Sequence, residues 1–201
     1  TFSSNELAIS LGYSNSYKDQ FHYGVNTKFI YSGIDEYSST ALAFDLGVLY
    51  LIPSTQWNFG LSLLNAGFQM SEYVNTSEEL PIDLRLAVSK KLEHLPLNIH
   101  FEFDNLTAYE ENFFDRFLNL SIGGEFTFSD YVRFRLGYDN SERQDLKTGS
   151  SLGIAGFSLG LGFSFLQNYT FDYSFNSLGN VGSTHSLNLG YDKKKKKNLT
   201  G

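Results

Sequence analysis

The chain has 201 residues, of which 18% are charged and 16% aromatic, and it contains no Cys. The charged share is below the roughly 25% of an ordinary soluble domain, and the lack of Cys excludes disulfides, thiolate catalysis and Cys-based zinc sites. The net charge is −7, but residues 1–192 hold 10 basic and 22 acidic side chains, a net of −12 that argues against nucleic acid as a partner.

Alternation of apolar with small or polar residues predicts eleven β-strands. In the second strand, Phe21, Val25 and Phe29 share one face, while Asn26 and Lys28 share the other. There is no run of about 18 apolar residues, so we expect no membrane-spanning helix. One helical turn is expected at 111–117. The expected strands are 5–14, 20–31, 41–51, 57–65, 81–90, 95–104, 117–128, 131–139, 153–165, 168–176 and 184–191.

The predicted connections alternate strictly in length. Short ones fall at 15–19, 52–56, 91–94, 129–130 and 166–167, and longer ones at 32–40, 66–80, 105–116, 140–152 and 177–183. Outer-membrane barrels have short periplasmic turns and long outward loops, whereas soluble sandwiches follow no such rule. Aromatic residues also flank most of the short turns, as in an interfacial girdle. We therefore predict an all-β fold, an antiparallel transmembrane β-barrel over residues 1–191, followed by a disordered Lys-rich tail at 192–201.

Strand parity gives an orientation. The last strand follows a long loop, so it would descend and end in the periplasm at Tyr191, with the C-terminus on that side. Single-chain bacterial barrels have even strand numbers. Because eleven is odd and the first strand also descends, we expect an odd number of further strands before Thr1.

No catalytic motif stands out, because G-x-S-x-G, a Walker A loop and H-E-x-x-H are all absent. His185 falls on the apolar face near the outer rim, but one histidine without a serine and an orienting partner is not a triad. The acidic residues near 139–145 lack calcium-loop spacing. The glycines within 153–162 fit a wall that bends or a backbone that comes close. We predict a non-enzymatic protein without metal or cofactor.

Ten charged residues take the polar parity and are expected to face the lumen. On the lipid side, an Arg or Lys would cost about 2–4 kcal/mol at the bilayer midplane. The ten charged residues could line a selective channel or form a docking site for a plug. Alternatively, they form a network of ion pairs that fills and stiffens the lumen. Because both signs of charge are mixed, we favour the network. The ten are Lys28, Asp45, Asp83, Arg85, Glu102, Asp104, Glu125, Arg133, Arg135 and Asp172.

Loops 66–80 and 105–116 combine acidic residues with aromatic ones, which are common anchors in protein interfaces. The candidate partner-binding residues are Tyr73, Tyr109, Phe113 and Phe114. Alternatively, these side chains fold back and cap the barrel mouth.

Five blocks of sequence carry a family resemblance: "LAISLGYSNSYKDQFHYGVNTKFIYSGIDEYSSTALAFDLGVLY", "LSLLNAGFQM", "ELPIDLRLAVSKKLEHLPLNIHFEFDNL", "FRLGYDNSERQDL" and "GIAGFSLGLGFSFLQNYTFDYSFNSLG". In order and spacing they resemble the PorV/PorQ family of the type IX secretion system of Bacteroidetes, closest to its PorQ branch, over residues 5–191. The resemblance implies a 14-stranded barrel related to FadL-type fatty-acid channels, of which three strands would precede this chain. The Lys-rich tail departs from the family pattern.

The resemblance also implies a function. By this resemblance, the protein would be an outer-membrane component of a Gram-negative bacterium, with loops at the cell surface and contacts to outer-membrane lipid. Such a component anchors a PorZ-like surface protein of the attachment complex that processes secreted cargo, alongside other secretion-system components. Alternatives are a FadL-like channel for small hydrophobic ligands, a PorV-like shuttle for cargo C-terminal domains, a soluble β-sandwich, and a lipid-modifying enzyme.

Overall fold

The computed structural model describes residues 4–35, 37–71, 79–109, 112–146, 154–165 and 168–191. The chain divides into two compact units, one comprising Thr1–Ser89 with Glu102–Asn119 and the other Lys90–Phe101 with Leu120–Gly201. The predicted tail at 192–201 lies outside the described residues.

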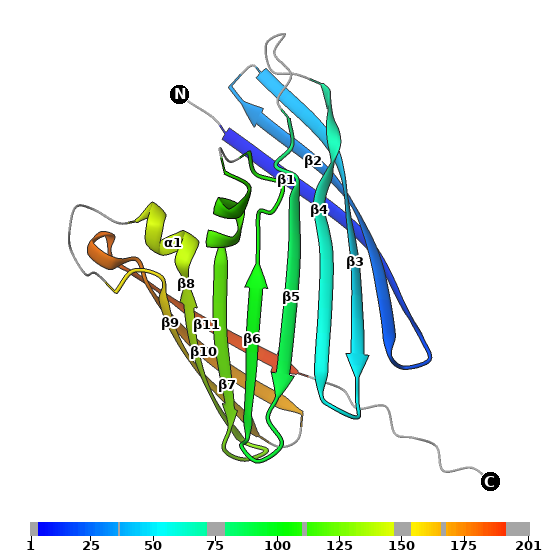
Figure 1. Cartoon of the computed structure of the whole chain (residues 1–201). Coiled ribbons are helices and arrows are strands. Elements are labelled where there is room, and N and C mark those ends of the chain that lie inside the picture. The colour runs from blue at the N-terminus through cyan, green and yellow to red at the C-terminus, as the bar shows by residue number, and fades with distance from the viewer. Residues whose placement is uncertain are drawn as a thin grey trace. The chain divides into compact units, whose positions relative to one another are not determined.

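Within the described ranges, eleven strands form one antiparallel sheet, in which each strand pairs with its neighbours in sequence from β1 to β11 (Figure 1). The all-β fold and all eleven predicted strands are therefore confirmed. In the described ranges β1 and β11 are not paired with each other, so the sheet is open and barrel closure stays a prediction. The strands are β1 (Ser4–Tyr17), β2 (Phe21–Ile34), β3 (Tyr37–Ile52), β4 (Trp57–Ser71), β5 (Asp83–Lys91), β6 (Leu97–Phe103), β7 (Leu120–Thr127), β8 (Val132–Asp139), β9 (Phe157–Phe165), β10 (Tyr169–Ser177) and β11 (Ser183–Tyr191).

Three short helical segments lie in the described parts of the connections. The 3-10 turn η1 (Phe113–Leu118) corresponds to the expected turn at 111–117, and η2 (Gly179–Val181) is a single turn. The α-helix α1 (Asn140–Asp145) was not expected; the Asp139 carboxylate caps it by accepting a hydrogen bond from the Glu142 amide at 2.8 Å. Within the described part of the chain, no helix is long and apolar enough to cross a membrane.

The strict alternation of connection lengths is wrong at two places. Strand β2 continues to Ile34 and β3 starts at Tyr37, so only residues 35–36 separate them where a loop at 32–40 was expected. Asp35 has φ 53°, a left-handed conformation that tight hairpin turns require and that Asp tolerates. Likewise, only residues 178–182 join β10 to β11. The longer connections are 72–82, 104–119 and 140–156.

The two faces of β2 are exposed in the opposite sense to those of a strand in a soluble protein, whereas β1 and β11 are exposed along nearly their whole length. Along β2, Phe21, Tyr23 and Val25 are 38–40% exposed, while the intervening His22 and Gly24 are less so. Among the described residues, the buried apolar side chains are only those of three alanines, and no large side chain is fully buried. A soluble domain places its large apolar residues inside, so this sheet presents outward the face that a soluble sheet would cover.

Candidate functional site

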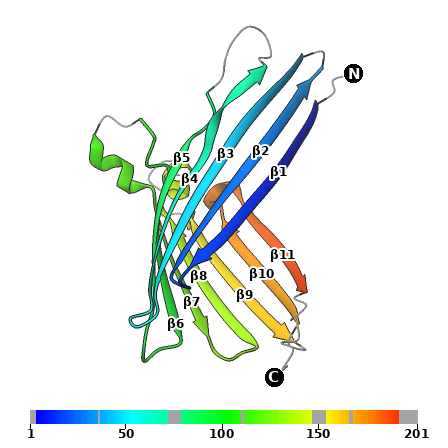
Figure 2. The same cartoon turned by 90° about the vertical axis from the view of Figure 1, so that its right-hand side faces the viewer.

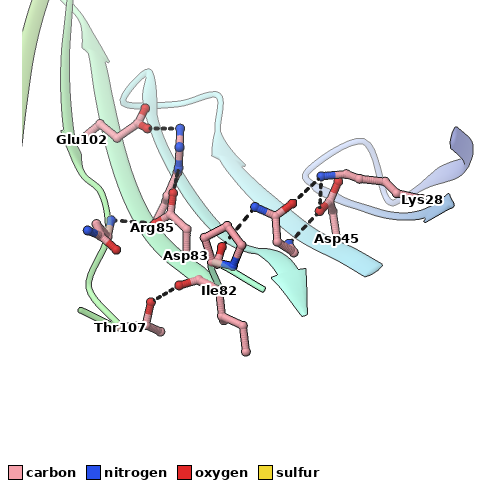
Figure 3. Close-up of polar contacts among 10 residues, drawn as sticks. Lys28, Asp45, Ile82, Asp83, Arg85, Glu102 and Thr107 are labelled. Carbon is pink, nitrogen blue, oxygen red and sulfur yellow. Dashed lines mark hydrogen bonds and ion pairs between the residues drawn. The ribbon is translucent and has the colours of Figure 1, made fainter. Parts of the chain in front are cut away.

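The first charged cluster of the polar face joins β2, β3 and β4 (Figure 3). Lys28 Nζ lies 2.8 Å from Asp45 Oδ1 and donates at 2.8 Å to Asn65 Oδ1. The other Asp45 oxygen accepts from Asn26 Nδ2 at 3.1 Å. Asn65 has φ 57° at a register shift between β3 and β4, and its amide N–H donates to Asp45 Oδ1 at 2.9 Å. The irregular backbone thus supplies a donor that a regular ladder would use between strands.

The second cluster ties the loop after β6 to the start of β5. Arg85 Nε lies 2.6 Å from Asp83 Oδ2, and Arg85 Nη1 lies 3.4 Å from Glu102 Oε1 (Figure 3). The second Asp83 oxygen accepts from the Asn105 amide at 2.6 Å, and the Thr107 hydroxyl donates to the Ile82 carbonyl. The Asp83 carboxylate and the Ile82 carbonyl, just before β5, therefore both hold the loop that follows β6. This loop leaves the sheet from a fixed point.

The third cluster belongs to the second unit and centres on Arg135. Its Nε lies 2.6 Å from Glu125 Oε2, directly opposite in the register of β7 and β8. Its Nη1 lies 2.7 Å from Asp172 Oδ1 on β10, so the side chain crosses the intervening strand β9. Gly160 on β9 pairs with Arg135, and a Cβ there would be 3.1 Å from the Arg135 Cβ; a Cβ on Gly162 would be 2.8 Å from Asp172 Oδ1.

The role of these two glycines therefore differs from the expectation. We predicted a wall bend or the close approach of another backbone in the 153–162 segment. At Gly160 and Gly162 the close neighbours are instead charged side chains, for which the missing Cβ atoms leave room.

Eight of the ten charged residues predicted for the lumen lie in these three clusters. Of the other two, Arg133 donates to Ser164 Oγ at 3.3 Å, and the Asp104 amide donates to the Asn119 carbonyl at 3.1 Å. The paired side chains are 16–41% exposed. This geometry favours the ion-pair network over a face of free charges, although whether the face encloses a lumen stays a prediction.

A hollow of about 670 Å³ lies on the polar face of the first unit. A row of small residues in register across β1 to β4 runs through it: Ser14, Gly24, Gly47 and Ser62. Arg85 and Glu102 also line it. The hollow therefore combines room close to the backbone with one charged pair.

Among the described aromatic residues of the 104–119 connection, one packs against the sheet and two are exposed. Phe117 packs edge-on against Phe103 of β6, with ring centroids 5.5 Å apart. Tyr109 is 92% exposed and Phe114 is 78% exposed. In Figure 2 the η1 turn lies to the side of strands β1 to β4 of the same unit. Tyr109 and Phe114 are thus exposed within the first unit, and the choice between partner binding and capping of a barrel mouth stays a prediction.

Two other predicted contact residues cannot be placed in the same way. Tyr73 lies outside the described residues, and of Phe113 only the backbone, as the first residue of η1, is described. Within the described ranges, no three acidic or histidine side chains are grouped as ligands of a metal ion would be.

Comparison with known protein families and with curated proteins gives no match to this chain. The structure itself defines a class: an all-β chain with an eleven-stranded antiparallel sheet, whose large apolar side chains are exposed and whose charged side chains are paired on the opposite face.

Proposed function

We propose that this chain forms part of the wall of an outer-membrane β-barrel that anchors a surface protein partner. The exposed apolar face supports the membrane part of the proposal, because lipid tails are a surrounding in which that face stays out of water. The paired charges support it from the other side, since a lumen-facing surface can hold polar residues that a lipid-facing one cannot.

The observation that carries the anchoring role is the exposure of Tyr109 and Phe114 on a connection that is fastened at both ends. The Asn105 amide donates a hydrogen bond to Asp83 at the start of β5, and the Phe117 ring packs against Phe103 at the end of β6. Exposed aromatic side chains are common interface anchors, and fastening the connection at two points limits the backbone freedom that binding would remove. Together with the resemblance to the PorV/PorQ family, this favours a non-enzymatic role in type IX secretion, with a PorZ-like protein as partner.

Co-purification of a PorZ-like surface protein tests the anchoring role. We expect the double variant Tyr109→Ser/Phe114→Ser to lose most of the partner, because each truncated hot-spot residue typically costs about 2 kcal/mol or more of binding. The matched control is Phe128→Ser/Tyr131→Ser, which removes two aromatic residues that are 67% and 61% exposed at the β7–β8 turn. Equal recovery of the partner with both double variants would exclude this connection as the anchor.

The hollow on the polar face favours one alternative, a channel for small hydrophobic ligands. Replacing Gly47 by Trp would fill the hollow from the middle of the small-residue row. If the protein is a channel, Gly47→Trp should lower ligand uptake into reconstituted vesicles severalfold. If the protein anchors a partner, Gly47→Trp should co-purify as much of that partner as the wild-type protein does.

A further inference from the structure

A small polar cluster interrupts the exposed apolar face of the second unit. The Tyr173 hydroxyl and Nδ1 of His185 are hydrogen-bonded at 2.8 Å, and Ser183 Oγ lies 3.3 Å from Nε2 of the same ring. Phe175, the register partner of His185, packs edge-on against it with ring centroids 5.4 Å apart. The histidine that stood alone in the sequence therefore has a hydroxyl at each ring nitrogen.

An apolar groove of about 370 Å³ reaches this cluster. It crosses β8, β9 and β10, which lie next to one another in the sheet (Figure 2). Its lining consists of Phe134, Leu159, Gly160, Leu161, Tyr173 and Phe175. The last two residues are also the ones that contact His185, so the groove and the polar cluster are continuous.

We propose that this surface binds one phospholipid, with an acyl chain in the groove and the phosphate at the Tyr173 and Ser183 hydroxyls. An acyl chain in the apolar groove buries hydrocarbon against hydrocarbon. In either neutral tautomer, the ring N–H of His185 donates to one of the two hydroxyl oxygens, which leaves the hydrogen of that hydroxyl free to donate to an anionic phosphate. None of the residues of the groove or cluster is acidic, so none of them repels the phosphate.

The place of the cluster along the strand fits a lipid headgroup. Ser183 is the first residue of β11 and His185 the third. At about 3.4 Å per residue, the ring lies about 7 Å from the end of the strand. In membrane-spanning sheets, amphipathic aromatic side chains gather at this level, where headgroups meet the hydrocarbon. Leu187 and Leu189, further along the strand, are 70% and 76% exposed, as the hydrocarbon level requires.

The inference rests on the proposed function, because it needs this face to meet lipid. The experiment therefore has two readouts on the full chain. Flotation with phosphatidylcholine vesicles measures membrane insertion. Native mass spectrometry, after extraction into detergent with added phosphatidylglycerol, measures how much of the lipid stays bound.

We expect the wild-type protein to keep one phosphatidylglycerol. Ser183→Ala/His185→Phe should weaken retention about tenfold, the loss expected from removing one hydrogen bond to a charged group. Leu161→Trp, which fills the groove, should weaken it to a similar degree. The matched control Leu189→Trp adds the same bulk outside the groove and should retain the lipid.

The two proposals can fail separately. Normal flotation with equal lipid retention in all variants would overturn the phospholipid site and leave the membrane proposal intact. Absence of flotation in the wild-type protein would overturn both. Displacement of the lipid by inorganic phosphate alone would show that the acyl chain contributes nothing and overturn the groove. Release of free fatty acid that depends on Ser183 would replace the binding role with ester hydrolysis.

Discussion

The ion-pair cluster around Arg135 allows a quantitative prediction about what the polar face contributes to stability. Replacing Arg135 by Met keeps most of the side-chain length but removes both ion pairs, to Glu125 at 2.6 Å and to Asp172 at 2.7 Å. A hydrogen bond to a charged group is worth about 1.5–3 kcal/mol, whereas a fully exposed pair is worth about 0.2–1 kcal/mol. These side chains are 25–37% exposed, which places each pair near about 1 kcal/mol.

Because the substitution also leaves two half-buried carboxylates without a counter-charge, we expect Arg135→Met to lower the free energy of unfolding by about 2–3 kcal/mol. Urea unfolding of the protein refolded in detergent micelles, followed by far-ultraviolet circular dichroism, measures this. The control is Arg133→Met on the same strand and face, whose hydrogen bond is to the neutral Ser164. It should cost less than about 1 kcal/mol.

A triple variant separates charge from packing. Adding Glu125→Gln and Asp172→Asn to Arg135→Met removes the unpaired charges, so the part of the loss caused by those charges should return, while the roughly 2 kcal/mol of the two lost ion pairs should not. The reasoning is refuted if Arg135→Met costs no more than Arg133→Met, or if the triple variant is no more stable than the single one.

Two further predictions use matched pairs within the first unit. A Cβ on Gly67 would overlap a carbonyl oxygen of the facing strand, whereas one on Gly47 would meet nothing within 4 Å. In the same unfolding assay, Gly67→Ala should therefore cost about 3 kcal/mol and Gly47→Ala about 0.5 kcal/mol or less; equal costs would contradict the close approach. Phe117→Ala should cost about 2–3 kcal/mol because it removes the contact with Phe103, while Tyr109→Ala should leave stability unchanged. A larger loss for Tyr109→Ala would show that its ring is packed.

The strands could be predicted because the signal for them is local. A period of two depends only on the order of residues along one segment, and in β2 it is clear from Phe21 to Val25 and again at Phe29 and Tyr31. The β2–β3 turn could not be placed as well. Ser, Gly and Asp near residue 35 are typical of loops, and the composition does not reveal that cross-strand pairing continues up to Ile34 and Tyr37.

The contacts between strands were harder to foresee because they depend on register. The alternation of residues predicted that Lys28 and Asp45 share one face. It could not predict the register shift between β3 and β4 by which the Asn65 amide reaches the Asp45 carboxylate. Similarly, Tyr173 meets His185 only because β10 and β11 pair in one particular register. A shift of two residues would keep every side chain on its face and still separate Tyr173 from the ring.

The burial pattern also bears on the choice between a membrane sheet and a soluble sandwich. A sandwich packs two sheet faces together, so large side chains such as those of Leu and Phe become fully buried between them. Among the described residues none does, and the buried apolar side chains are those of Ala41, Ala43 and Ala155. Alanine burial offsets little of the conformational entropy lost when strands of this length become ordered. Within the described residues, the Leu and Phe side chains of the sheet therefore stay uncovered, which supports the proposal that lipid covers this face.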